Sequence, residues 1–257
     1  MSFQKNMHIW NDTVNTCNSF NWKPTKSIKY EYLDIVPEKK FDNTFVNILD
    51  LDSIDCGYEL LKRGFNPIVL NMADDCFPGG HVQMGSGAQE ESLFRRTNYF
   101  QTLNLETGYY PLINSQLIYS PQVTIIKNQN GDYLNKYFNL PFIACPAVKK
   151  PNLIDNKFSD KDKRIFIQKV KNILNVAYHN NYDSVVLGAL GCGAWQCPQE
   201  EVANICKQIC NDYIGVFKNI NFAILEVDKH EYIVKNTNQD RSNLDIFSKV
   251  FYGWLSI

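Results

Sequence analysis

The sequence lacks any long apolar run. No stretch approaches the ~18 uninterrupted apolar residues of a membrane-spanning helix, so no membrane association is expected. The opening segment MSFQKNMHIWNDT contains no apolar core of the kind that signal peptides carry. These absences predict a protein that is not secreted and that works in the cytoplasm or nucleus.

A surplus of one charge is also missing. The 26 Lys and Arg residues nearly balance the 27 Asp and Glu residues, which leaves a net charge of -1. No global positive field therefore draws nucleic acid or an anionic membrane to the protein. A polyanionic ligand would have to be held by local donors in a pocket.

Patterns that indicate other protein classes are absent too. There is no internal repeat of solenoid length, no low-complexity linker and no G-x-x-x-x-G-K-[ST] motif, which argues against a P-loop NTPase. The eight cysteines do not indicate a secreted disulfide framework in a chain of this size, so we expect free buried thiols. Because Cys192, Cys197, Cys206 and Cys210 fit no common zinc spacing, no metal or cofactor is expected.

Short apolar runs alternate with amphipathic segments in the rest of the chain. The runs predict buried strands, and apolar residues at helical spacing predict the helices between them. In chain order we expect a strand over 67–73, a glycine-rich loop over 78–87, a helix from Ala88, strand pieces in 117–126 broken at Pro121, a strand over 142–145, a helix over 162–181, a strand over 184–190, a second glycine loop over 191–195, a helix after Pro198 and a strand over 221–227.

This alternation predicts an α/β fold with helices on both faces of the sheet. The order is clear only in the later part, so we divide the chain into an N-terminal extension (1–60) packed on a core domain (61–257). Ligands of such sheets bind outside the carboxyl ends of the strands, and both glycine loops lie at such ends.

Both glycine loops follow an apolar strand and lead into a helix. Converging backbone N–H groups and the helix dipole make such a place favourable for anionic oxygens. One glycine loop alone is better explained by a tight turn, whereas two on neighbouring strands could hold a diphosphate and the sugars beside it. The tripeptide Gln-Glu-Glu begins both following helices, at 89–91 and 199–201, and acids there are ordinary. Only the first copy follows directly on a glycine-rich loop that could bring a ligand to the carboxylates.

Several segments resemble the bacterial-type poly(ADP-ribose) glycohydrolases. The strand Val69-Leu70-Asn71-Met72-Ala73, the glycines of Pro78-Gly79-Gly80 and the helix start Gln89-Glu90-Glu91-Ser92-Leu93 are similar to the signature of that family. Further similar segments follow in order: Tyr119-Ser120-Pro121, Ala144-Cys145-Pro146-Ala147, Leu187-Gly188-Ala189, Gly191-Cys192-Gly193-Ala194 and the helix start at Pro198. The resemblance spans roughly residues 66–230 and is strongest at the two loops.

The resemblance implies a three-layer α/β/α macrodomain with a mixed central sheet and an N-terminal extension. It implies that the protein cleaves ribose–ribose O-glycosidic bonds of poly(ADP-ribose) and releases ADP-ribose. Poly(ADP-ribose) or ADP-ribosylated macromolecules would be its partners and ADP-ribose its product ligand, and we expect a monomer.

The resemblance also assigns site residues. Glu91 would be the catalytic acid and base, and Glu90 would orient the ribose hydroxyls. The implied substrate-binding residues are Asn71, Gly79, Gly80, His81, Gln89, Gly191, Cys192, Gly193, Ala194 and Trp195. Among these, Asn71 would bind ribose, residues 191–194 would surround the diphosphate with N–H groups, and Trp195 would pack on a ribose or the adenine. His81 departs from the family, which has a third glycine there.

Consecutive carboxylates favour a single acid–base residue. Neighbouring residues on a helix point about 100° apart, so Glu90 and Glu91 do not readily flank one bond as a glycosidase pair. A single carboxyl that acts first as acid and then as base fits this arrangement better.

Two related functions stay open on the sequence alone. One is a module that binds ADP-ribose without turnover. The Glu90-Glu91 pair favours the enzyme, whereas His81, which departs from the family pattern, leaves the binding module as an alternative. The other is a hydrolase of mono-ADP-ribose on a protein or nucleic-acid acceptor, which would share the pocket. Outside the loops, Arg95 and Arg96 are expected to be solvated, and His179 and His230 to lie on the surface or in the core.

Overall fold

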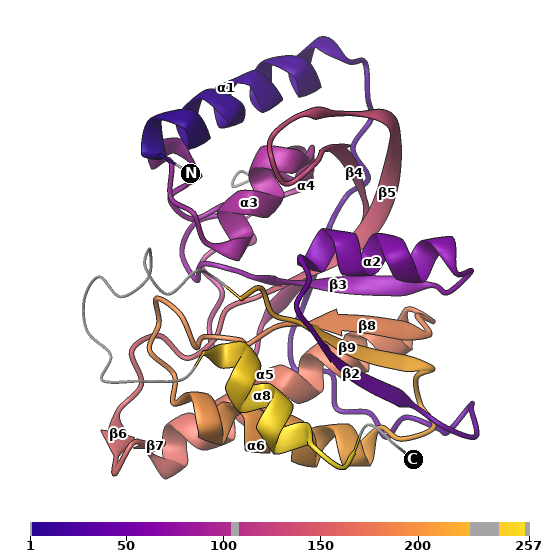
Figure 1. The fold of residues 1–257 in the computed structure, drawn as a ribbon, viewed down its shortest axis with the longest axis vertical. Helices are drawn as coiled ribbons and strands as arrows, with labels where there is room; N and C mark the ends of the chain where they lie inside the picture. The colour runs from indigo at the N-terminus through magenta and orange to yellow at the C-terminus, as the bar shows by residue number, and fades with distance from the viewer. Residues whose placement is uncertain (1, 104–107, 227–241, 255–257) are drawn as a thin grey trace.

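The computed structural model describes residues 2–103, 108–226 and 242–254. Its main feature is a seven-stranded sheet in the order β1-β4-β5-β3-β8-β9-β2, with helices on both faces (Figure 1). The strands are β1 Ile28–Tyr30, β2 Phe45–Leu49, β3 Pro67–Met72, β4 Leu117–Lys127, β5 Tyr133–Cys145, β8 Ser184–Leu187 and β9 Asn219–Ala223.

The sheet is mixed. The strands β5, β3, β8, β9 and β2 pair in parallel, whereas β4 pairs antiparallel with both β5 and β1. A separate two-stranded hairpin joins β6 Leu153–Ile154 to β7 Lys157–Phe158. The predicted α/β fold with a mixed central sheet is therefore confirmed.

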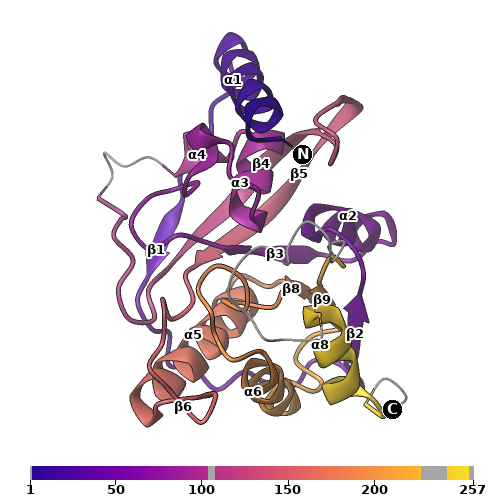
Figure 2. The same ribbon diagram turned by 60° about the vertical axis from the view of Figure 1, so that its left-hand side comes forward.

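The helices form two layers, one on each face of the sheet (Figures 1 and 2). One layer holds α1 Phe3–Ser19, α2 Ser53–Lys62, α3 Gln89–Arg96 and α4 Tyr99–Thr102; the other holds α5 Asp160–His179, α6 Gln199–Asp212 and α8 Asn243–Phe251. Strand residues alternate between the two cores, as the two-residue period of a strand requires: Val69 packs in the first and Leu70 in the second.

The first 60 residues contribute to the sheet itself. Strand β1 forms one edge and β2 forms the other, where, of the strands the structure describes, it pairs only with β9. The sheet thus runs across the expected division between residues 1–60 and 61–257. Helix α1 packs on the first layer, where Trp10 contacts Phe94 and Phe100 at ring-centroid distances of 6.2 and 5.3 Å.

Several predicted elements change their bounds. The strand expected to break at Pro121 is continuous, because a register shift between Ser120 and Val123 accommodates the proline. The run at 142–145 is the end of the longer β5, and β8 stops at Leu187 instead of residue 190. The last strand starts earlier than expected and ends at Ala223, whereas Val227 lies outside the described residues.

All eight cysteines are free, and seven of them are buried, as predicted. Cys206 and Cys210 lie one turn apart in the core face of α6. Within the described ranges, no helix has both the length and the apolar character needed to cross a bilayer.

Candidate active site

Two neighbouring carboxylates begin helix α3 at the carboxyl edge of the sheet. Glu90 and Glu91 are only 3% and 6% exposed, although acidic residues in a first helical turn usually face solvent. The N-cap residue Ala88 has no side chain that could cap the helix. Both carboxylates instead turn toward the loop that connects β3 to α3.

The Glu90 carboxylate is fixed on both of its oxygens. Oε2 accepts a hydrogen bond from the Asp74 backbone N–H at 2.7 Å, and Oε1 accepts from Gly79 N–H at 3.2 Å and Asn71 Nδ2 at 3.1 Å. Burial raises the pKa of Glu90 to about 8, helped by the nearby Glu91 charge and opposed by these three donors. Glu90 is therefore held rigidly against the first loop.

The Glu91 carboxylate has one free oxygen. Oε1 accepts a hydrogen bond from the His81 backbone N–H at 3.1 Å. Oε2 is buried and has no hydrogen-bond partner among the described residues. Because buried carboxylate oxygens are almost always bonded, this oxygen is the atom of the pair at which a hydrogen bond is left unmade.

The two glycines of the first loop allow this close approach. Gly80 has φ +51°, and a Cβ atom there would lie 2.8 Å from Glu91 Oε1 and 3.4 Å from Glu90 Oε2. Gly79 has φ +80°, and a Cβ atom there would lie 2.5 Å from the Phe94 ring. His81 follows with φ -101° and an exposed side chain. The backbone at this third position therefore does not require glycine.

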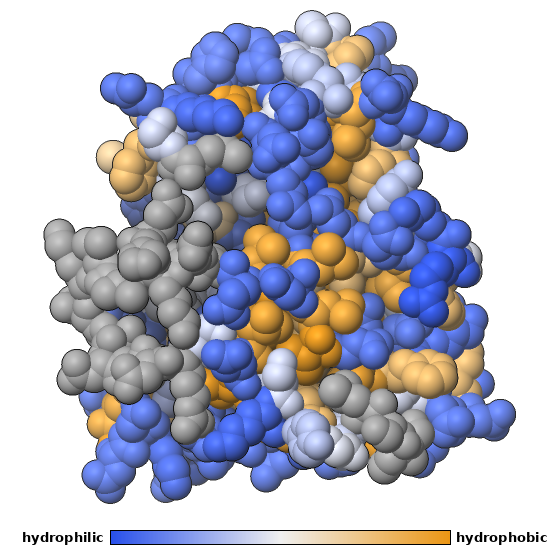
Figure 3. All heavy atoms as spheres, viewed as in Figure 1, coloured by the Kyte–Doolittle hydropathy of each residue, from blue (hydrophilic) through white to orange (hydrophobic). Residues whose placement is uncertain are grey.

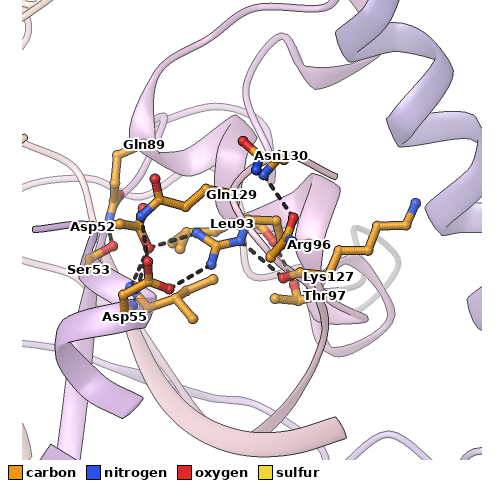
Figure 4. A network of polar contacts seen from close by, with 12 residues as sticks. Asp52, Ser53, Asp55, Gln89, Leu93, Arg96, Thr97, Lys127, Gln129 and Asn130 are labelled. Carbon is orange, nitrogen blue, oxygen red and sulfur yellow. Dashed lines mark hydrogen bonds and ion pairs between the residues drawn. The ribbon is translucent and has the colours of Figure 1, made fainter. Parts of the chain in front are cut away.

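Helix α3 is attached to helix α2 at both of its ends (Figure 4). At the first end, Gln89 Nε2 donates to Ser53 Oγ at 3.0 Å and to Leu70 O at 2.7 Å. At the other end, Arg96 pairs with Asp52 at 2.7 Å and with Asp55 at 3.0 Å. These contacts fix the position of α3 on α2 and its rotation about its own axis. They thereby fix the direction in which its carboxylates point.

Both arginines of α3 are buried, so the expectation of solvated side chains was wrong. Arg96 is 3% exposed, and its Nε also donates to Lys127 O at 3.2 Å. Arg95 is covered as well and donates to Ser86 O in the first loop. The reason is that the carboxylates of α2 and carbonyl groups elsewhere in the fold supply partners for both guanidinium groups.

Replacing Arg96 with Met is expected to destabilise the protein by about 3–5 kcal/mol, because Asp52 would remain buried without its counter-charge. Chemical unfolding would measure this. The control is Lys62→Met, which removes the exposed Lys62–Glu59 ion pair and should change stability by at most about 1 kcal/mol. Equal effects of the two substitutions would show that α3 does not depend on this attachment.

The second glycine loop follows β8 at the same edge of the sheet. Gly191 has φ +79°, and a Cβ atom there would lie 2.5 Å from Cys197 Sγ, so the turn requires glycine. Cys192 is buried, and its N–H donates to Ala189 O at 3.1 Å. Within the described part of the chain, the N–H groups of Gly193, Ala194 and Trp195 donate to no protein acceptor. Consecutive free N–H groups of this kind can bind anionic oxygens.

Trp195 is half-buried beside this loop. The Lys149 ammonium lies 5.5 Å from its ring centroid and also pairs with Asp75 at 2.6 Å. Asp75 comes from the segment after β3, so this ion pair connects the two loop regions. The expected packing of Trp195 on a ligand stays a prediction.

Three predicted residues have roles that the sequence did not indicate. Asn71 is completely buried and donates to Glu90, and the Gln89 amide is bonded to Met72, Ser53 and Leu70. Glu201 does more than offset the dipole of α6, because it accepts from Phe158 N–H and pairs with Lys163 at 3.0 Å.

The two histidines outside the loops lie apart from the site or outside the description. His179 ends α5 beside Tyr30, and His230 lies outside the described residues.

Asp74, Asp75 and Cys76 place three potential metal ligands within 4.8 Å of one another. Protein groups already use the two carboxylates: Asp74 Oδ1 accepts from the N–H groups of Cys76 and Phe77, and Asp75 pairs with Lys149. We therefore assign no metal to this turn.

Comparisons with known proteins agree with this geometry. Residues 10–128, which include both carboxylates and the first loop, match the family model of the microbial-type PARG catalytic domain. A comparison with curated protein sequences gives no match.

Similar solved structures are poly(ADP-ribose) glycohydrolases (PARG). The Thermomonospora curvata enzyme has a TM-score of 0.81 and 20% identity, covering 96% of this chain and 100% of that one. The same enzyme bound to the inhibitor ADP-HPD has a TM-score of 0.78 and 20% identity, with coverage of 96% and 99%. The Deinococcus radiodurans enzyme in complex with ADP-ribose has a TM-score of 0.71 and 22% identity, with coverage of 84% and 87%. The expected macrodomain fold and the resemblance to this family are thus confirmed.

Proposed function

We propose that this protein, which has the fold of the bacterial poly(ADP-ribose) glycohydrolases, cleaves ribose–ribose O-glycosidic bonds of poly(ADP-ribose) and releases ADP-ribose. One observation carries the proposal. Two buried carboxylates meet at a glycine loop, and one of them, Glu91, keeps an oxygen that no residue of the described ranges bonds. The family match over residues 10–128 covers this arrangement and supports it.

The two carboxylates have different chemical roles in this proposal. Glu91 Oε2, as a carboxylic acid, gives its proton to the leaving ribose oxygen while the bond from that oxygen to the anomeric carbon breaks. The resulting carboxylate then takes a proton from the water that attacks the oxocarbenium-like carbon, which restores the acid. Glu90 cannot take over this role without losing hydrogen bonds, because both its oxygens are bonded to the first loop and Asn71. It fixes the place of the ribose hydroxyls instead.

Other surfaces at this edge suit the rest of an ADP-ribose unit. The free N–H groups of Gly193, Ala194 and Trp195 are donors for the diphosphate. An apolar area lies in the middle of the face shown in Figure 3, between α2 and α8, over the part of the sheet where Figure 1 draws β2 and β9. A ligand that combines a diphosphate with a flat base needs both kinds of surface.

Incubation with two substrates tests the proposal. The purified protein is given poly(ADP-ribose) and, separately, a mono-ADP-ribosylated protein, and released ADP-ribose is measured by chromatography. Release from the polymer is the expected result. Release only from the mono-ADP-ribosylated protein would favour the mono-ADP-ribosyl hydrolase, and binding without release would favour a module that only binds ADP-ribose.

Free ADP-ribose is expected to raise the melting temperature. At 100 times its Kd, a ligand that binds only the folded state adds about 2.7 kcal/mol of stability. Thermal melting with increasing ADP-ribose measures this.

The matched control is Gly193→Val. Gly193 is exposed and has no positive φ, so valine should leave the fold intact while its branched side chain crowds the free N–H groups. A melting shift of equal size in both proteins would show that the second loop does not hold the diphosphate.

A further inference from the structure

Helix α1 packs against the part of the chain that holds the two carboxylates. It lies alongside α3 (Figures 1 and 2) and also contacts η1 Val82–Met84, a 3-10 turn within the first glycine loop. The family match begins at residue 10, so the first two turns of α1 lie outside it. What these turns do for the loop has to be explained from their contacts.

One buried hydrogen bond joins the beginning of α1 to the loop. Asn6 is 4% exposed, and its Nδ2 donates to Gly85 O at 2.9 Å. Gly85 has φ +79°, and a Cβ atom there would lie 2.3 Å from Phe3 O, so the loop backbone lies directly against the helix backbone. A donor and close packing together fix the position of Gly85 on α1.

The Asn6 amide makes this one side-chain hydrogen bond within the described ranges. Its Oδ1 is buried and has no partner there. A buried unpaired oxygen costs stability, and an apolar residue of similar shape, such as leucine, would avoid that cost. The bond to Gly85 is therefore what asparagine provides at this position and what an apolar residue cannot.

Backbone hydrogen bonds connect Gly85 to one of the carboxylates. Gly85 N–H donates to Val82 O at 3.0 Å, and Met84 N–H donates to His81 O at 3.0 Å. The His81 N–H in turn donates to Glu91 Oε1 at 3.1 Å. Because these bonds close the turn between His81 and Gly85, a shift of Gly85 would also move the donor of the Glu91 carboxylate.

A second contact of α1 reaches the other side of this carboxylate. Thr13 is buried, and its Oγ1 donates to Arg95 O at 2.5 Å, near the end of α3. The Arg95 guanidinium donates back to Ser86 O, the residue that follows Gly85. Helix α1 thus contacts both the loop and the helix between which Glu91 lies, and it can set their separation.

We propose that Asn6 is a positioning residue for Glu91 and acts through the first glycine loop. By holding Gly85 on α1, the Asn6 amide keeps the His81 N–H within reach of Glu91 Oε1. That hydrogen bond sets the direction of the carboxylate and leaves Oε2 for the chemistry. The proposal rests on the proposed function only for its effect on turnover, since its structural part concerns the ligand-free protein.

Asn6→Ala removes the donor. In the ligand-free protein, hydrogen exchange followed by NMR should show the His81 N–H exchanging about tenfold faster than in the wild type, while the N–H groups of β3 keep their protection. We expect kcat on poly(ADP-ribose) to fall about tenfold with KM within about twofold, because a misplacement of about 1 Å costs about 10²-fold and a smaller one less.

Asn11→Ala is the matched control, because Asn11 lies on the same helix and its side chain is exposed. It should leave kcat and the exchange of the His81 N–H within about twofold of the wild type. Asn6→Leu is the second variant, since leucine keeps nearly the shape of asparagine but cannot donate. It should reproduce both effects of Asn6→Ala, and it decides the matter if the alanine variant loosens the whole of α1.

Three results would overturn the proposal. The first is unchanged exchange of the His81 N–H in both Asn6 variants. The second is a rise in KM with kcat unchanged, which would mean that the loop binds substrate without directing Glu91. The third is faster exchange throughout β3 in both variants, which would mean that Asn6 only stabilises the fold. If the wild type does not cleave poly(ADP-ribose), the proposed function fails, whereas the exchange measurement still tests the positioning of the loop.

Discussion

Replacing Glu91 with Gln should lower the rate of glycosidic cleavage by about 10²–10⁴-fold or more, the usual contribution of general acid–base catalysis. Glutamine has nearly the same shape and still accepts the His81 N–H, so the loop should keep its conformation. It cannot give a proton to a leaving oxygen or take one from water. Affinity for ADP-ribose should stay within about tenfold of the wild type, as measured by calorimetry.

Glu200→Gln is the matched control for this substitution. Glu200 occupies the same kind of position in the Gln-Glu-Glu that begins α6, and its side chain is exposed. Glu201, the position that corresponds to Glu91, is less suitable because it holds Phe158 and Lys163. If Glu91→Gln keeps wild-type turnover, or if Glu200→Gln is equally damaging in a folded protein, then the chemistry does not reside at Glu91.

The second large effect is expected from Gly80→Ala. The backbone of Gly80 has φ +51°, which costs an alanine about 1–2 kcal/mol. Its methyl group would also lie 2.8 Å from Glu91 Oε1, so the carboxylate must move. Since a misplacement of about 1 Å can lower turnover about 10²-fold, we expect a loss of that order in kcat.

Gly87→Ala separates this effect from a general loss of loop flexibility. Gly87 lies in the same loop, has no positive φ and has open space around its Cβ position. Its replacement should leave kcat within about twofold and stability within about 0.5 kcal/mol. Comparable losses of kcat in the two variants would show that contact with Glu91 is not what Gly80 provides.

Sequence patterns predicted the parts of the site that are local in the chain. The apolar strand, the glycines and the carboxylates all lie in one continuous segment between Pro67 and Glu91. A strand, a loop and a helix start that follow one another in the chain can be recognised from the local pattern alone. The backbone has positive φ at positions 79 and 80, a conformation that only glycine adopts readily. The need for this conformation is therefore visible in the sequence as two glycines.

The sequence did not predict what surrounds the carboxylates. Arg96 looks like an ordinary helix-surface residue, and its partners Asp52 and Asp55 lie more than 40 residues earlier, on another helix. Tyr99 follows Thr97 and Asn98, and nothing in this stretch indicates that its ring packs against Phe94 and Phe142. Its surroundings arise only when β3, α4 and β4 pack together, so pattern and spacing carry no signal for it.

The two edge strands escaped prediction for a different reason. Strand β1 has three residues, and β2 has five with only one fully buried side chain. Neither shows the alternation or the continuous apolar run that identifies a strand. Their pairing is fixed by distant partners, since β1 joins β4 and β2 joins β9.

The pairing of β2 with β9 also bears on how the chain matures during synthesis. Phe45 is aligned with Asn219, and β9 is the partner of β2 in the described part of the sheet. At about 5–20 residues per second, a ribosome needs on the order of 10–30 s to translate from β2 to β9. During this interval β2 and the apolar sides of β3 and β8 cannot be enclosed in a finished sheet. We expect folding to be completed only as the last part of the chain emerges, so ribosome-bound chains that end before Asn219 should be digested by protease while full-length chains resist.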